Sequence, residues 1–256
     1  MTPLVEIDGT RPTPEELLHP ALVNYGHFTA MQVRGGAVRG LDLHLARLRD
    51  AHFELFGTEV DTGRVRRLMR RAVAARADTY LRVTLYEAEP GAPRVMTVIR
   101  PAIDVPATPQ SLTPVAYMRP FPHIKHVGSF AQIRHGLLAE RAGFDDALLV
   151  TDAGLVTETT TANIGFVDGG DVVWPAAPCL RGITWQLLDA GLAERGREAR
   201  SEDVTLDTID RFEAVFLANS IGVAPVARIG AREFDAADPR VAELVDVYRD
   251  VPWDTI

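Results

Sequence analysis

The spacing of apolar and polar residues predicts that the first half of the chain mixes helices with strands. The stretch FTAMQVRGGAVRGLDL (28–43) alternates on both sides of Gly35-Gly36, which predicts a β-hairpin with its turn at the glycines. Apolar residues then recur at helical spacing over 42–56, and Gly57 is a suitable helix stop. A second helix is predicted over about 61–77, and strands over 79–88 and 94–100.

The second half is dominated by short strands. Six prolines between residues 101 and 122 exclude a long helix there and indicate a connection over about 101–111. Beyond it we expect helices over 129–142 and 182–196, and strands over 111–118, 146–152, 155–160, 163–169, 171–175, 214–220 and 223–229. The pattern predicts an α+β protein with two domains, residues 1–110 and 111–256.

Composition narrows the class of protein. The chain has 256 residues, 46 % of them apolar and 24 % charged, which is ordinary for a soluble globular protein. A net charge of −8 argues against nucleic-acid binding, and the basic run RVRRLMRR (64–71) has the spacing of a solvated helix face. No apolar run reaches the ~20 residues of a membrane span, and no secretory signal pattern is visible at the N-terminus. With Cys179 as the one cysteine, we expect a cytoplasmic protein.

Lysine occurs once, in PFPHIKHVGSF (120–130), whereas the chain has 26 arginines. A lysine can lose its proton when desolvated and can form a Schiff base with a carbonyl, and arginine can do neither. Lys125 is therefore a candidate nucleophile. Taken alone, it is equally well explained by a strong bias toward arginine that left one lysine by chance.

Three further features have chemistry that suits such a lysine. Glu158 follows a predicted turn on a strand, LRGIT (180–184) opens a helix whose amides can bind phosphate, and Arg47 lies on the first long helix. A lysine, a carboxylate for a pyridinium proton and phosphate anchors are what pyridoxal 5′-phosphate (PLP) requires. Individually, each also has an ordinary explanation: an exposed strand carboxylate, a helix cap and a surface cation.

The order and spacing of these residues resemble the class IV, or fold type IV, PLP-dependent aminotransferases, a family that includes branched-chain and D-amino-acid aminotransferases and 4-amino-4-deoxychorismate lyase. The strongest match is GFDDALLVTDAGLVTETTTANIGFVDGGDVVWP followed by LRGIT, and the resemblance extends from Tyr25 to Pro225. It implies a small α/β N-terminal domain and a larger C-terminal pseudo-barrel that carries most of the PLP site. It also implies a homodimer.

The resemblance assigns roles to individual residues. Lys125 would be the catalytic Schiff-base lysine, Glu158 would hold the pyridine nitrogen, and Asn163 would buttress the glutamate strand. The other cofactor-binding residues would be Arg47, Leu180, Gly182, Ile183, Thr184 and Ser220. His123 and His126 flank the lysine, but no third ligand stands at useful spacing, so no metal site is predicted.

The sequence departs from the family around the substrate. Thr29 stands where a glutamate is usual, and Phe130 stands where branched-chain enzymes have a tyrosine. Leu85 occupies the place of the arginine that traps the substrate carboxylate in D-amino-acid enzymes. The remaining candidates for contact with substrate are Phe28, Arg34, Arg82, Arg119 and Phe130.

The resemblance favours an aminotransferase that moves an amino group between a small amino acid or amine and a keto acid. Two alternatives remain at this stage. One is a lyase on the same fold that releases pyruvate, as 4-amino-4-deoxychorismate lyase does. The other is a PLP-binding protein without transaminase turnover. None of the three implies a membrane or nucleic-acid partner.

Overall fold

A computed structural model describes residues 3–74, 76 and 78–256, and the chain divides into two units. Unit 1 contains the chain up to Asp104, together with Ile124–Gly128 and Pro252–Ile256. Unit 2 contains Val105–His123 and Ser129–Val251. The predicted domains were two continuous stretches, 1–110 and 111–256, whereas each unit is assembled from separate stretches. The difference arises because residues 124–128 and the last five residues pair with strands of unit 1.

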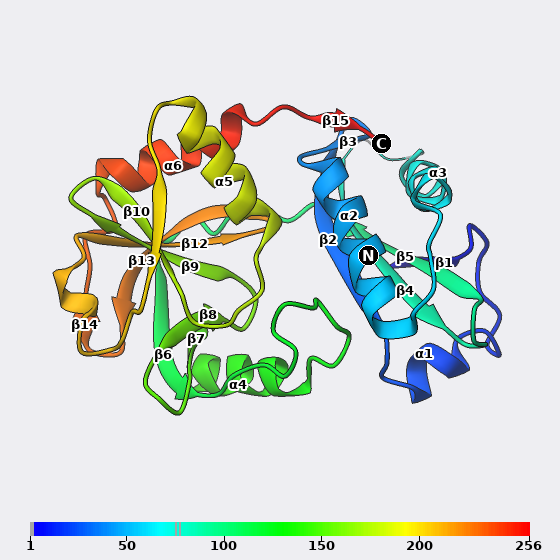
Figure 1. The fold of residues 1–256 in the computed structure, drawn as a ribbon, viewed down its shortest axis with the longest axis horizontal. Coiled ribbons are helices and arrows are strands. Elements are labelled where there is room, and N and C mark those ends of the chain that lie inside the picture. Colours follow the sequence, from blue (N-terminus) through cyan, green and yellow to red (C-terminus); the bar gives the residue numbers. More distant parts are fainter. Residues whose placement is uncertain (1–2, 75, 77) are drawn as a thin grey trace. The chain divides into compact units, whose positions relative to one another are not determined.

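Unit 1 is built on a six-stranded sheet in the order β1-β5-β4-β2-β3-β15 (Figure 1). Its strands are β1 (Leu4–Ile7), β2 (His27–Arg34), β3 (Ala37–Val38), β4 (Asp78–Glu87), β5 (Pro93–Pro101) and β15 (Asp254–Thr255). Gly35 and Gly36 both have positive φ, which confirms the predicted turn between β2 and β3. In the alternation of β2, Met31 and Val33 enter the core, and Gln32 and Arg34 lie on the other face.

Helices α2 (Leu41–Phe56) and α3 (Thr62–Val73) pack on this sheet, and a short helix α1 (Leu18–Leu22) precedes β2. Leu48 of α2 and Met69 of α3 share one apolar core with Leu81 and Val83 of β4. Gly57 ends α2 in the left-handed conformation, as predicted. The predicted end of α3 at about residue 77 includes residues 75 and 77, which lie outside the described residues.

Unit 2 is a closed barrel. Strands β6 (Gln110–Ala116), β7 (Asp146–Val150), β8 (Val156–Thr159), β9 (Asn163–Asp168), β12 (Ala214–Asn219) and β13 (Gly222–Ile229) pair in a circle, because β13 also pairs with β6. The pairing of Glu158 with Asn163 joins β8 to β9. Strands β10 (Asp171–Pro175) and β11 (Ala199–Glu202) extend the sheet from β9, and β14 (Arg232–Glu233) pairs with β13.

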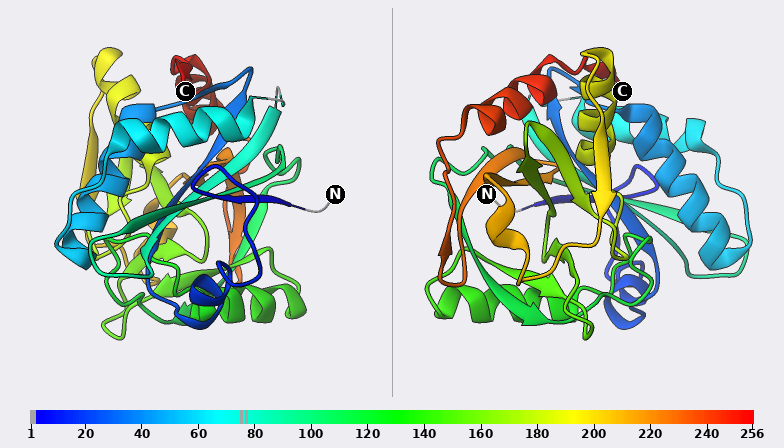
Figure 2. Two further views of the ribbon diagram at one scale, coloured as in Figure 1. Left: turned by 90° about the vertical axis from the view of Figure 1, so that its right-hand side faces the viewer. Right: turned by 60° about the vertical axis from the view of Figure 1, so that its left-hand side comes forward.

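Helices α5 (Ile183–Glu194) and α6 (Pro239–Asp250) lie together on one side of the barrel, and α4 (Phe130–Arg141) lies on the other (Figures 1 and 2). A 3₁₀ turn, η1 (Ile209–Arg211), precedes β12. The predicted α+β class and the larger barrel unit are confirmed. The elements that lie outside the predicted ones are α1, α6, β1, β11, β14 and β15. Within the described residues, no helix is both long enough and apolar enough to cross a bilayer.

Candidate active site

The backbone around Lys125 is fixed to the first residues of β2 within unit 1. The amide of Phe28 donates to the carbonyl of Lys125 at 2.8 Å, and the amide of Val127 donates to the carbonyl of Gly26 at 2.9 Å. His27 and His126 form the bridge between these two hydrogen bonds. The segment that carries the lysine is therefore held as an additional short strand at the edge of β2, although it follows β2 by almost 100 residues.

Two cations lie against the ring of Phe28. The Lys125 Nζ is 5.1 Å from the ring centroid, and the Arg82 guanidinium carbon is 3.7 Å from it. Arg82 also donates from Nε to the hydroxyl of Thr84 at 3.2 Å. Burial lowers the pKa of Arg82, and within the described residues no carboxylate forms an ion pair with it. A desolvated cation of this kind is suited to bind an anionic ligand.

His44, on α2, is an uncharged imidazole near the lysine. Burial, followed by the charges of Arg47 and then Lys125, lowers the pKa of His44 to about 3. Its Nδ1 lies 2.6 Å from the hydroxyl of Thr29. Thr29 therefore points into the core of unit 1 and fixes the imidazole. The sequence shows that Thr29 replaces the glutamate usual in the family, but it does not predict the contact with His44. Residue 29 meets residue 44 only when β2 and α2 pack together.

Arg34 is separated from this group. It lies six residues beyond Phe28 on the same strand, or about 20 Å at the rise of an extended chain. Its guanidinium donates to the side chain of Gln32 and to the carbonyl of Val33, both at 3.1 Å. The structure thus brings Phe28 and Arg82 together with Lys125 and leaves Arg34 at the other end of β2.

In unit 2, Glu158 forms a buried ion pair. The Arg119 Nε lies 3.0 Å from the Glu158 Oε1, and the two side chains are 6 % and 9 % exposed. The sequence offered Arg119 only as a candidate for binding a substrate carboxylate. The structure instead pairs it with a carboxylate of the protein, because Arg119 follows β6 and Glu158 lies on β8, two strands that both pair with β7.

Asn163 connects the glutamate strand to the loop before α5. Its backbone pairs with Glu158, its Nδ2 donates to the carbonyl of Leu180 at 2.6 Å, and its Oδ1 accepts from the amide of Gly182 at 3.1 Å. A Cβ on Gly182 would lie 2.1 Å from that Oδ1. Residue 182 must therefore be glycine for the loop to keep this geometry.

The first turn of α5 has donors that fit a phosphate group. Gly182 is the N-cap and supplies no side-chain acceptor, and the first turn contains no acidic residue. The amides of Ile183 and Thr184 precede the first i→i−4 bond of the helix, so they point outward from its positive end. The hydroxyl of Thr184 donates to the carbonyl of Asn219 at 2.6 Å, which fastens α5 to the turn that carries Ser220.

Two other side chains of unit 2 were singled out in the sequence. Phe130 is the first residue of α4, and its side chain is 81 % exposed. Cys179 precedes Leu180, and burial, reinforced by the Glu158 charge and opposed by Arg119, raises the pKa of its thiol to about 12. A thiol with this pKa is protonated at neutral pH, so Cys179 is a small uncharged side chain.

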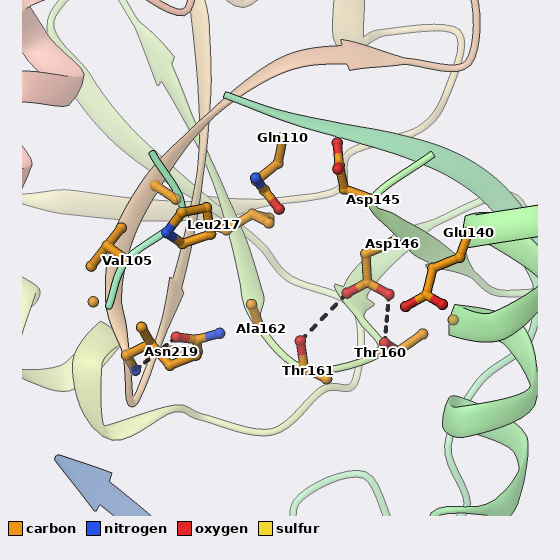
Figure 3. Close-up of a pocket in the computed structure, with 15 residues that line it drawn as sticks. Val105, Gln110, Glu140, Asp145, Asp146, Thr160, Thr161, Ala162, Leu217 and Asn219 are labelled. Carbon is orange, nitrogen blue, oxygen red and sulfur yellow. Dashed lines mark hydrogen bonds between the residues drawn. The ribbon is translucent and has the colours of Figure 1, made fainter. Parts of the chain in front are cut away.

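Unit 2 also contains a cavity of about 260 Å³ near the turns that follow Glu158 and Asn219. Three carboxylates line it, Glu140, Asp145 and Asp146, and the lining contains no lysine or arginine. Thr160 donates to Asp146 at 2.5 Å and Thr161 does so at 3.5 Å (Figure 3). An acidic lining disfavours a phosphate, so the amides of α5 remain the better phosphate site.

Known proteins resemble this chain in sequence and in fold. A probable branched-chain-amino-acid aminotransferase of Rickettsia felis is 35 % identical over 83 residues, which are 32 % of this chain and only 29 % of that relative. The structure of a hypothetical aminotransferase from Mycobacterium tuberculosis in its PLP-bound form matches with a TM-score of 0.83 at 22 % identity, over 96 % of this chain and 98 % of that one. The structure of a putative 4-amino-4-deoxychorismate lyase from Legionella pneumophila matches with a TM-score of 0.82 at 21 % identity, over 91 % of this chain and 93 % of that one.

The family model for amino-transferase class IV matches residues 26–229, most of the chain. That range contains the segment of Lys125, the ion pair of Glu158 and the first turn of α5. The solved structures share the two-unit fold with its barrel, which confirms the fold type IV architecture. The chain therefore belongs to the class IV aminotransferase family.

Proposed function

We propose that this protein is a PLP-dependent aminotransferase that moves an amino group between a small amino acid or amine and a keto acid. The observation that supports this most directly is the placement of the chain's single lysine. The Lys125 amine lies beside an aromatic ring, and two hydrogen bonds fix the backbone of residues 125–127, in a chain of the class IV aminotransferase family.

The residues present fit the cofactor. We assign the phosphate to Arg47, the amides of Ile183 and Thr184, and Ser220, and we assign the pyridine nitrogen to Glu158. Gly182 has no side chain to obstruct the helix end, and Leu180 is buried beside it. When bound, PLP supplies an aldehyde for a Schiff base with Lys125 and an electron-withdrawing ring that stabilises negative charge at the substrate Cα.

The protein's own residues perform the proton chemistry. With the cofactor bound, the Lys125 amine would be the group that takes up the proton from the substrate Cα and later gives it back. The pKa of His44, at about 3, keeps that imidazole neutral, so it adds no positive charge beside the lysine. Glu158, as a carboxylate, favours the protonated form of the pyridine nitrogen.

We assign the carboxylate of the substrate to Arg82. The observation that favours Arg82 over Arg34 is that its guanidinium lies on the ring of Phe28, and Lys125 lies near the same ring. An amino acid held by its carboxylate at Arg82 would direct its amino group toward Lys125. Phe130, which is exposed at the start of α4, is the second aromatic side chain that we assign to substrate contact.

The test is spectroscopic. Purified protein incubated with PLP should develop the visible absorption of a Schiff base, and Lys125→Ala should not develop it. Addition of amino donors should then bleach the band as the amino form of the cofactor accumulates. A wild-type protein that takes up no PLP would refute the proposal.

A lyase that releases pyruvate is the second candidate, because a putative 4-amino-4-deoxychorismate lyase from Legionella pneumophila shares the fold of this chain. The two functions require the same lysine and glutamate, so the products discriminate between them. An aminotransferase converts bound PLP to its amino form in a single half-reaction. A lyase returns PLP unchanged and releases pyruvate.

A further inference from the structure

We propose that Arg119 is a positioning residue for Glu158, which keeps this carboxylate ionised and oriented toward the cofactor nitrogen. The inference rests on the proposed function for its link to catalysis. The ion pair itself is independent of any cofactor: Arg119 Nε and Glu158 Oε1 are 3.0 Å apart, and each side chain is less than a tenth exposed.

The burial of this pair distinguishes it from pairs on the surface of the same unit. In the pair between Arg195 and Asp250, the side chains are 35 % and 67 % exposed, so water screens the charges. Removing one partner from a buried pair leaves the other as an uncompensated charge, and a carboxylate in that position takes up a proton more readily. Glu158 is therefore more sensitive to the loss of its partner than a surface carboxylate is.

The same guanidinium also fixes the turn that precedes the lysine segment. Its Nη2 donates to the carbonyl of Pro122. Between the two residues, Phe121 has a φ of 47°, a left-handed conformation that is uncommon for a bulky residue. Its side chain is 68 % exposed, so packing contributes little to holding it there. Arg119 thus connects the glutamate to a constrained turn that ends directly before residues 124–128.

The charges of this pair act on two titratable side chains of the same unit, Tyr117 and Cys179. Burial raises the pKa of Tyr117, the charge of Arg119 opposes this rise, and the charge of Glu158 adds to it. Burial, the Glu158 charge and the opposing Arg119 charge act in the same directions on Cys179. Because Cys179 is the only cysteine, its alkylation reports on the pair without any cofactor present.

The first experiment measures the rate at which iodoacetamide alkylates Cys179, by mass spectrometry between pH 7 and 10, in protein stripped of PLP. At pH 9 to 10, where Glu158 stays ionised even without its partner, Arg119→Gln should slow alkylation by roughly 3- to 10-fold, because the carboxylate is then uncompensated beside the thiol. Glu158→Gln should accelerate it, and the double variant should return close to the wild-type rate. Rates unchanged by Arg119→Gln would overturn the proposed pairing.

The second experiment uses the protein loaded with PLP and follows the pH dependence of the first half-reaction. Without Arg119 the pKa of Glu158 rises, so the rate should fall at a higher pH than in the wild type, by about one pH unit or more. In Arg119→Lys, the fall of the rate on the acid side of the pH profile, its acid limb, should return most of the way to the pH of the wild type. A residue with only a structural role would lower stability without moving this limb.

The matched control is Arg195→Gln, which removes a surface arginine of the same unit and should change neither readout. An acid limb that stays in place in Arg119→Gln, in protein that still binds PLP, would overturn the positioning role. If the wild-type protein binds no PLP, the proposed function fails, and the alkylation rates still decide whether Arg119 compensates Glu158.

Discussion

Glu158 is the residue whose charge we expect to matter most to turnover. Glu158→Gln preserves the shape of the side chain but replaces the carboxylate with a neutral amide, which cannot favour a protonated pyridine nitrogen. The variant should keep its visible absorption with PLP and lose at least about tenfold in the half-reaction rate, because a shift of one pKa unit changes a protonation equilibrium tenfold. Stopped-flow absorbance measures the rate, and unchanged turnover would contradict the assigned role.

Arg82 gives a separate prediction about substrate. Arg82→Gln removes the cation over Phe28, so the KM for an amino acid should rise about 10- to 100-fold, the range expected when a charge-assisted hydrogen bond is lost. Uptake of PLP should not change. Arg67→Gln is the control, because Arg67 is an exposed arginine on α3 of the same unit. Equal KM values for Arg82→Gln and the wild type would exclude Arg82 from carboxylate binding.

At the scale of elements, the first turn of α5 depends on a glycine. Gly182→Ala would place a methyl group 2.1 Å from the Asn163 Oδ1 and disrupt both side-chain hydrogen bonds of Asn163. We expect a loss of about 1–3 kcal/mol in the free energy of unfolding, as for other overpacked sites, and weaker binding of PLP. Urea denaturation and a PLP titration measure the two effects.

Gly136→Ala on α4 is the matched control for this change. The nearest atom to its added methyl group would be 3.5 Å away, an ordinary contact, and alanine favours a helix over glycine. This variant should be as stable as the wild type or more so. If both alanine variants had the same stability and the same affinity for PLP, the close contact between Asn163 and Gly182 would not constrain residue 182.

Two buried histidines, His27 on β2 and His44 on α2, should make the free energy of unfolding fall in acid. Burial, and then the charge of His52, lowers the pKa of His27 to about 3, and His44 is lowered to the same value. The unfolded chain binds these protons below about pH 6.5, and the folded chain does not until about pH 3. Stability should therefore be unaffected above pH 6.5 and fall by roughly 1.4 kcal/mol per pH unit for each histidine below it.

Urea unfolding at pH 7, 6 and 5 tests this dependence. His27→Gln removes one of the two buried imidazoles. The slope of the free energy of unfolding against pH should therefore decrease by about half of the joint contribution of the two histidines. His123→Gln, which changes an exposed side chain, should leave the slope as it is in the wild type. A slope that His27→Gln does not change would show that the buried imidazole is not the source.

At the scale of the whole molecule, we propose a homodimer, as the family resemblance implies. Helix α4 exposes Phe130, Ile133 and Leu137, at 81 %, 61 % and 44 %, and their spacing places them on one face. Light scattering should give twice the chain mass of 28.0 kDa. Ile133→Glu should shift the protein toward monomer, and a wild-type protein that is monomeric at micromolar concentration would contradict the proposal.

The last residues of the chain belong to the structure of unit 1. The Asp254 Oδ2 accepts from the amide of Leu41, at the start of the helix that carries Arg47, and Ile256 is buried in the core of that unit. Gly40, the residue before this helix, has no side chain that can cap it. A residue more than 200 positions away therefore supplies the cap, which no pattern local to Leu41 could indicate.

The sequence by itself determined most strands and helices, because period-2 and period-3.6 patterns reflect which side chains face a core. It also determined the family, because the order and spacing of Lys125, Glu158 and LRGIT can be read directly along the chain. Only the tertiary structure decided that Arg119 meets Glu158, that Thr29 meets His44, and that residues 124–128 join β2. These contacts join residues 15 to 100 positions apart, and local propensity contains no information about such pairs.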